Sequence, residues 1–255
     1  MPSDQAPPPA PYREHSPPSV LQPHFQCLWN STVARDYAGG FLVVPDGCVD
    51  IVCKGGRLLA VGPDRVAARP ALAPGSEVWG GRFRPGAAGA WLGLPMDEIV
   101  GQAVELGDLL GPRAWEWVHR INDAQPEGRQ AVFLQGLAQM GRDAPAPDRQ
   151  AMQLFDLAAE AGRDESGVLA AMRAQLDMPE RSLRRFCHAQ FGYGPKTLER
   201  VLRFQRLLAL ARSDRQAGLA VLALDAGYAD QAHLSREVRA LCGITAQAAM
   251  AQLLD

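Results

Sequence analysis

The chain has 255 residues, of which 47% are hydrophobic and 21% charged, and its formal net charge is −2. This composition is typical of a folded, water-soluble protein long enough for two domains. No apolar run approaches the roughly 18 residues of a membrane span, no N-terminal secretion pattern is present, and the five scattered cysteines fit reduced thiols. We therefore expect a cytoplasmic protein with no membrane partner and no disulfide framework.

The small net charge conceals a difference between the two parts of the chain. Residues 1–162 carry 13 basic and 18 acidic side chains, whereas residues 163–255 carry 13 basic and 10 acidic ones. Seven of the basic side chains fall within 179–206, against two glutamates. Such a local excess of positive charge is typical of contact with a polyanion, although a solvated helix face would also produce it.

The N-terminal part is predicted to contain a leader and a small β-rich domain. Residues 1–23 hold eight prolines and little that could build a core, so we expect a flexible leader there. Residues 24–96 show short apolar runs separated by Gly- and Pro-containing turns, which predicts a β-rich domain. Its expected strands are 41–44, 48–53, 58–61 and 78–83.

A helical period begins after this domain. Residues 97–143 predict a helical connector with short helices at 97–110, 112–123 and 127–141, which are natural candidates for dimer contacts. The sequence Ala-Pro-Ala-Pro at 144–147 then predicts a short linker.

The segment 148–255 predicts an all-α domain. Asp230 and Thr245 suit helix N-caps, because their side-chain oxygens can accept from free backbone N–H groups. Gly192, Gly227 and Gly243 stand where helices should end. The expected helices are 149–161, 167–176, 179–191, 195–213, 219–226, 230–241 and 245–253.

Two segments of this domain match each other at an offset of 51 residues. Leu183 aligns with Leu234, Arg185 with Arg236, Ala189 with Ala240, and Gly192 with Gly243. Each segment follows a short apolar helix and a tight turn, which predicts two helix-turn-helix units. The helix between them spans roughly 28 Å at 1.5 Å per residue. This length can hold two recognition helices near the roughly 34 Å that separates successive major grooves on one face of DNA.

Two stretches carry a family resemblance. Residues 226–236 (AGYADQAHLSR) and 242–245 (CGIT) resemble the second helix-turn-helix of the AraC/XylS regulators, and residues 178–186 (MPERSLRRF) with 191–196 (FGYGPK) resemble the first.

The β-rich segment is also similar to a domain found ahead of AraC-type DNA-binding domains. The similarity lies in residues 44–51 (VPDGCVDI), 61–63 (VGP) and 81–87 (GRFRPGA). The resemblance implies a sensory role for this domain and specifies no ligand. The predicted fold class is therefore α+β, with a β-rich N-terminal domain, a helical connector and an all-α domain of two helix-turn-helix units joined by a long helix.

The candidate DNA-contacting residues are polar side chains on the two recognition helices and at the start of the joining helix. Arginine can bind guanine bidentately or clamp a phosphate, and glutamine can read adenine. An ordinary solvated helix face is the alternative, and for His233 a role at the helix start. Leu183, Phe186, Leu234 and Val238 are expected in the core, with Tyr228 packed between helices. The candidates are Arg181, Ser182, Arg184, Arg185, Lys196, Gln231, His233 and Arg236.

We therefore predict a sequence-specific transcription regulator that binds double-stranded DNA in two successive major grooves, modulated by a small-molecule effector at the N-terminal domain. RNA polymerase and a second copy of the chain are further candidate partners. No catalytic residue, cofactor or metal site is predicted, because the sequence has no Ser/His/Asp set, metal-spaced histidine cluster or nucleotide fingerprint. The alternative is a small-molecule-binding or enzymatic N-terminal domain that carries a helical interaction bundle.

Overall fold

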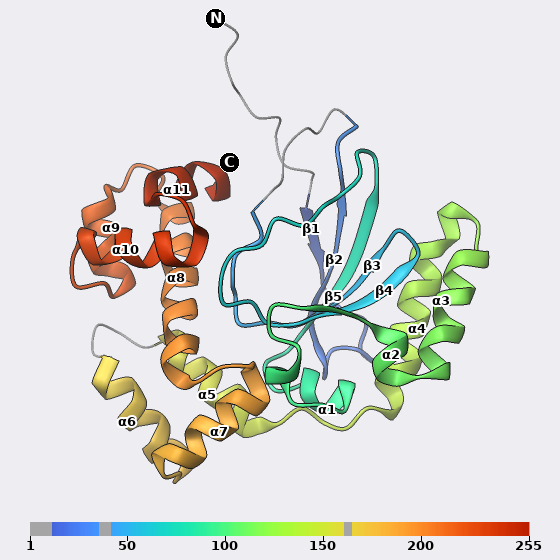
Figure 1. The fold of residues 1–255 in the computed structure, drawn as a ribbon, viewed down its shortest axis with the longest axis horizontal. Coiled ribbons are helices and arrows are strands. Elements are labelled where there is room, and N and C mark those ends of the chain that lie inside the picture. Colours follow the sequence, from blue (N-terminus) through green and yellow to red (C-terminus); the bar gives the residue numbers. More distant parts are fainter. Residues whose placement is uncertain (1–11, 36–41, 161–164, 255) are drawn as a thin grey trace, which may run out of the picture.

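The computed structural model describes residues 12–35, 42–160 and 165–254. These residues form a six-stranded sheet partly covered by helices, followed by an all-helical C-terminal domain (Figure 1). Each part has its own hydrophobic cluster, one drawn from the first 137 residues and the other from Ala151 onward. The α+β class is thus confirmed. Among the described residues, no helix is both long and apolar enough to cross a membrane.

The sheet has the order β1-β2-β5-β3-β4-β6, and every neighbouring pair is antiparallel. The Trp29 ring of β2 packs directly on the backbone of Gly80 in β5, where an added Cβ would lie 2.2 Å from the ring. The strands are β1 (Tyr12–His15), β2 (Phe25–Thr32), β3 (Asp50–Lys54), β4 (Arg57–Val61), β5 (Glu77–Phe83) and β6 (Ala103–Glu105).

Helices after β5 complete the N-terminal core. Trp117 and Phe133, from two antiparallel helices, stack with their ring centroids 5.7 Å apart, and both are buried in the same cluster as Ile51 of β3. The helices are α1 (Ala88–Leu92), α2 (Leu106–Leu110), α3 (Pro112–Asp123) and α4 (Arg129–Asp143), with 3-10 turns η1 (Met96–Glu98) and η2 (Pro126–Gly128). The segment 97–143 is therefore part of the N-terminal domain and not a separate connector.

Three predictions for this half are wrong in detail. Residues 12–23 belong to the domain, because β1 pairs with β2 and Leu21 is fully buried; residues 1–11 lie outside the described chain. The helix expected at 97–110 is divided into η1, strand β6 and α2, since 103–105 pair with β4. The strand expected at 41–44 is reduced to one bridge between Val43 and Ala68, and Phe41 is not described.

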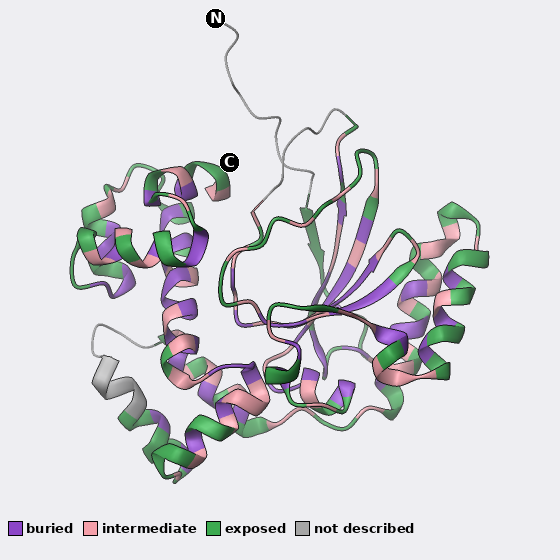
Figure 2. Cartoon of the chain, viewed as in Figure 1, coloured by how far each residue is buried: buried purple, intermediate pink, exposed green. Residues whose placement is uncertain are grey.

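The helices of the C-terminal domain were predicted to within about two residues at their ends. They are α5 (Arg149–Glu160), α6 (Glu165–Leu176), α7 (Glu180–Phe191), α8 (Pro195–Ser213), α9 (Leu219–Ala226), α10 (Gln231–Cys242) and α11 (Ala246–Leu254). Helix α8 is the axis of the domain, with α5–α7 around its first end and α9–α11 around its second (Figure 1). Figure 2 shows buried residues along much of α8, whereas the outer faces of α9 and α10 are exposed.

Candidate nucleic-acid interface

The first helix-turn-helix unit consists of α6 and α7. Leu183, Cys187 and Phe191 form the buried side of α7, because a spacing of four residues returns to the same helix face. Arg181 and Arg185 are exposed near the beginning of the helix. The helix therefore presents arginines at its free N-terminal half, as a groove-reading helix requires.

The three other candidates of this unit differ in exposure. Arg184 is exposed and lies 3.9 Å from the Glu180 carboxylate one turn earlier, an exposed ion pair that contributes little to stability. Ser182 is half-buried, and Lys196 is exposed in the first turn of α8.

The second unit consists of α9 and α10. Asp230 caps α10 as predicted, since its carboxylate accepts the backbone N–H of His233 at 2.6 Å. Leu234, Val238 and Leu241 are buried, whereas Gln231 and Arg236 are exposed. This unit thus repeats the arrangement of the first.

The 51-residue repeat is visible in the structure. Leu183 and Leu234 are both fully buried, and Arg185 and Arg236 are both exposed. Gly192 and Gly243 end the two recognition helices with φ angles of 79° and 73°, a left-handed conformation that glycine adopts without strain. The two units are therefore equivalent in fold and in which positions they expose.

His233 is engaged by its own unit. Its Nδ1 accepts the backbone N–H of Ala229 at 3.3 Å, and its ring lies edge-on to Tyr228 with centroids 5.4 Å apart. Tyr228 is fully buried between the helices, as predicted, and the Arg203 guanidinium lies 5.2 Å from its ring centroid. The geometry thus gives His233 a local structural contact that the sequence could not distinguish from DNA contact.

Polar contacts hold α9 and α10 on α8. Arg200 of α8 pairs with Glu237 of α10 at 2.6 Å, and Arg206 donates to the Ala226 carbonyl at the end of α9. Both arginines belong to the basic stretch at 179–206. Part of that charge excess is therefore structural, because these side chains face protein groups.

One loop of the N-terminal domain, residues 62–69, contacts both units, and we call it the junction loop. Arg65 donates to the Gly192 carbonyl at 3.2 Å, at the end of α7. The Ala67 N–H donates to the Leu241 carbonyl at 2.7 Å, near the end of α10. One loop thus joins the C-terminal ends of both recognition helices while their N-terminal halves stay exposed.

A second contact reaches α8. Gln205 donates to the Pro45 carbonyl at 2.6 Å, and a Cβ added at Gly47 would lie 2.9 Å from the Phe155 ring of α5. The neighbouring Asp46 carboxylate lies 3.1 Å from Arg82 of β5. The loop at residues 45–47, which contacts α5 and α8, is therefore tied to the sheet by an ion pair.

Arg82 is the centre of a charged cluster on the sheet. Its guanidinium also lies 3.5 Å from Asp50 and 3.7 Å from Glu14, and Trp29 donates its indole N–H to Asp50 at 3.1 Å. Burial raises the pKa of Asp50 to about 6, while Arg82 acts in the opposite direction. No local sequence pattern identifies this cluster, since Arg82 lies more than thirty positions after Asp46 and Asp50 in the chain.

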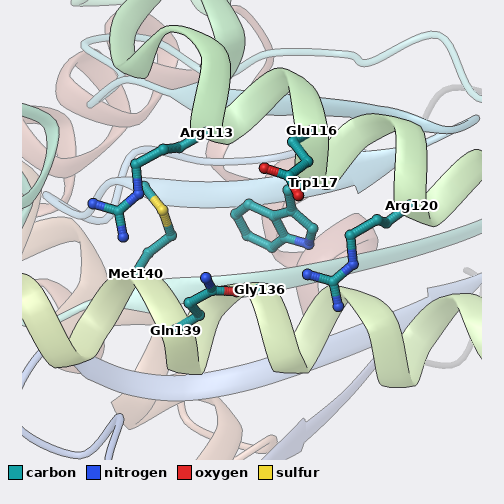
Figure 3. A pocket seen from close by; sticks show the side chains of 7 residues that line it. All are labelled: Arg113, Glu116, Trp117, Arg120, Gly136, Gln139 and Met140. Atoms are coloured by element: carbon teal, nitrogen blue, oxygen red, sulfur yellow. The ribbon is translucent and has the colours of Figure 1, made fainter.

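The helices proposed for dimer contacts carry a small cavity of about 100 Å³ between α3 and α4 (Figure 3). Trp117 lies between Arg113 and Arg120 and packs on Gly136, where an added Cβ would be 2.0 Å from the indole. The cavity is smaller than the roughly 300–1,000 Å³ of most small-molecule sites. It is therefore a packing gap beside Trp117 and a poor candidate for an effector site.

Comparisons with known proteins match one domain model within each of the two parts of the chain. A helix-turn-helix domain model matches residues 172–252, which contain both units, and a domain of unknown function, DUF6597, matches residues 13–105. The chain is a DNA-binding transcription regulator with an AraC-type helix-turn-helix domain.

Solved structures similar to this regulator include ToxT from Vibrio cholerae O395, at 10% identity and a TM-score of 0.44, covering 96% of this chain and 95% of that one. The same protein bound to (E)-4-(8-methylnaphthalen-1-yl)but-3-enoic acid matches with the same identity and score, covering 96% of each chain. No curated protein sequence matches the regulator.

Proposed function

We propose that the regulator reads two successive major grooves on one face of duplex DNA, with α7 in one groove and α10 in the next. The observation that supports this most strongly is the equivalence of the two units, each of which leaves the N-terminal half of its second helix exposed. Helix α8 separates them by a rigid length of about 28 Å, close to one turn of DNA.

The DNA-contacting residues are proposed in three groups. Arg181 and Gln231 lie in the first turns of α7 and α10 and read bases; Arg185 and Arg236, one turn further on, bind phosphates. Ser182, Arg184 and Lys196 add backbone contacts to the first unit, and His233 positions the start of α10 through Tyr228.

We further propose that the N-terminal domain regulates DNA binding through the junction loop. Because Arg65 and Ala67 contact the ends of both recognition helices, a shift of this loop changes the position of both helices together. The Arg82–Asp46 ion pair ties the second contact, between Pro45 and Gln205 of α8, to the sheet, where a small-molecule effector would act. The proposal includes no catalysis, since regulators of this type normally act by binding.

The cellular setting follows from this role. A cytoplasmic regulator of this kind meets RNA polymerase at promoters, and a second copy of the chain would extend the DNA site.

The proposed function is tested by selecting binding sites from randomised duplexes with the full chain. We expect a recovered sequence with two conserved blocks about 10 base pairs apart, centre to centre. A single block would contradict the two-groove arrangement, and no enrichment would favour the alternative of a helical interaction bundle.

Salt dependence provides an independent measurement on the selected site. With roughly six phosphate contacts, the slope of log K against log salt should be near −5. A slope near zero would contradict a duplex footprint of this size.

A further inference from the structure

A cavity of about 330 Å³ lies between the N-terminal domain and the first helix-turn-helix unit. We call it the junction cavity. Its walls come from the junction loop, one side of α7 and the first turn of α8. The lining residues are Arg65, Glu180, Arg184, His188, Tyr193, Gly194, Pro195, Lys196 and Thr197.

The junction cavity has an excess of cationic side chains. Arg65, Arg184 and Lys196 are positively charged at neutral pH, and Glu180 is the one carboxylate among the lining residues. Glu180 lies 3.9 Å from Arg184 and offsets that charge in part. Arg65 uses one N–H for the Gly192 carbonyl, and within the described part of the chain neither Arg65 nor Lys196 forms an ion pair.

Tyr193 adds a polar group to the lining of the junction cavity. Its side chain is 1% exposed, and its hydroxyl has no hydrogen-bond partner. A buried polar group without a partner costs roughly 1–3 kcal/mol, so such groups normally have one. Burial raises the pKa of Tyr193, the nearby Asp46 and Asp64 carboxylates add to the increase and Arg65 opposes it, so the hydroxyl stays protonated and is available as a donor.

The backbone at the beginning of α8 favours the same kind of ligand. The helix has 19 residues, and Gly194 at its N-cap has no side chain to accept from the first turn. Pro195 has no N–H and the Thr197 N–H donates to the Gly194 carbonyl at 3.0 Å, which leaves the Lys196 N–H as the donor of this turn. The positive end of the helix dipole therefore faces the wall formed by residues 194–197.

We propose that the junction cavity binds a phosphate group, held by Arg65 from the N-terminal domain and by Arg184 and Lys196 from the DNA-binding domain. Two sources share this chemistry: a small phosphorylated ligand and a phosphate of the DNA backbone. In either case Arg65 makes the N-terminal domain a direct part of the phosphate site. A small ligand would compete with DNA for Arg184 and Lys196 and thereby lower DNA affinity.

The first experiment titrates inorganic phosphate into the full chain without DNA, at constant ionic strength, and follows the melting temperature. We expect a saturable rise, because a ligand that binds only the folded state stabilises it. Arg65→Ala and Lys196→Ala should remove the saturable part. Tyr193→Phe should weaken phosphate binding several-fold without loss of stability, since it deletes an unpartnered hydroxyl. Arg212→Ala, on an exposed arginine near the other end of α8, is the matched control and should respond like the parent.

The second experiment measures binding to the selected DNA site over a salt series. If a backbone phosphate occupies the junction cavity, Arg65→Ala should reduce the salt slope by about one, and Arg212→Ala should not. If the source is a small ligand, the slope should stay unchanged while inorganic phosphate competes with DNA in the parent and not in Arg65→Ala.

Absence of both the saturable phosphate response and any effect of Arg65→Ala on DNA binding would overturn the phosphate site. If the parent still binds its selected DNA in that case, the proposed function stands and only the junction cavity loses its role. The phosphate titration requires no DNA, so the two proposals fail separately.

Discussion

At the scale of single residues, the exposed arginines of α7 differ in their distance from the start of the helix. Arg181 is the second residue of α7, whereas Arg185 lies four positions later. In the second unit Gln231 is the first residue of α10, and Arg236 lies five positions later. Because the N-terminal residues of a recognition helix contact base edges, the earlier position in each unit should determine sequence preference.

Alanine substitutions should separate these roles. Arg181→Ala and Gln231→Ala should each cost about 1–3 kcal/mol on the selected site and relax the preference at one or two base pairs. The two affected positions should lie about 10 base pairs apart, one helical turn. Binding-site selection run on each variant beside the parent measures both effects.

Arg185→Ala and Arg236→Ala are the matched controls. As phosphate anchors, they should weaken binding to all sequences alike and reduce the salt slope by about one. If Arg181→Ala and Gln231→Ala disturb the same base pairs, the two-groove arrangement is wrong.

Asp64 in the junction loop should make stability depend on pH. Burial raises its pKa to about 6, and the nearby Asp46 carboxylate adds to the increase. The folded chain therefore binds this proton more tightly than the unfolded chain does. The free energy of unfolding consequently falls as pH rises from about 4 to about 6, and the loss persists at neutral pH.

Asp64→Asn should remove this dependence. We expect the variant to be more stable than the parent by about 1 kcal/mol at pH 7, a value reduced for partial exposure, and equal to it near pH 4. Urea denaturation at the two pH values measures the difference. The exposed Asp97→Asn should stay within about 0.5 kcal/mol of the parent at both. A stabilisation of Asp64→Asn that is the same at both pH values would contradict the burial of a charged carboxylate.

At the scale of elements, the two recognition helices end alike but in different surroundings. A Cβ added at Gly192 would lie 2.5 Å from Val100 and 2.8 Å from Pro63, both in the N-terminal domain. A Cβ added at Gly243 would meet nothing within 4 Å. The left-handed glycine at 243 therefore only ends its helix, whereas the one at 192 also contacts the N-terminal domain.

Substitution by alanine should separate these two functions. Gly243→Ala should cost about 1 kcal/mol, the strain of a left-handed non-glycine residue. Gly192→Ala should cost a further 1–3 kcal/mol or so, because its methyl group forces the two domains apart. Denaturation of the full chain measures the cost, and limited proteolysis at 144–147 reports the separation. Equal costs for both variants would show that the contact at Gly192 is absent in solution.

At the scale of the whole molecule, two cores predict two units that fold independently. The first needs its N-terminal residues, since Leu21 is fully buried and packs near Gly141 of α4. The second begins at Asp148, whose carboxylate accepts the N–H groups of Gln150 and Ala151 and so caps α5.

Fragments test this division. A fragment of 12–143 should melt cooperatively, and a fragment of 148–255 should bind the selected DNA. A fragment of 24–143 should be less stable by about 2–5 kcal/mol, because it loses the Leu21 side chain from the core along with β1. If 148–255 shows no DNA affinity at low salt while the full chain binds, the modular arrangement is wrong. Equal stability of the two fragments 12–143 and 24–143 would show that residues 12–23 are a flexible leader and not part of the folded domain.

The sequence alone determined the C-terminal domain, because its signals are local. Helical periodicity, the Asp230 and Thr245 caps and the glycines after α7, α9 and α10 all act within a few residues, so helix ends were predicted closely. The 51-residue repeat then identified both units and their exposed side chains without any knowledge of packing.

Tertiary structure decided the strands and contacts that depend on residues far apart in the chain. Strand β1 is exposed at all four positions and exists because β2 pairs with it, and β6 exists because β4 does. Arg65 reaches Gly192 across 127 positions, and Arg82 brings together Glu14, Asp46 and Asp50. No short-range pattern contains such contacts, since strand pairing and domain packing bring together residues that nothing in the local sequence connects.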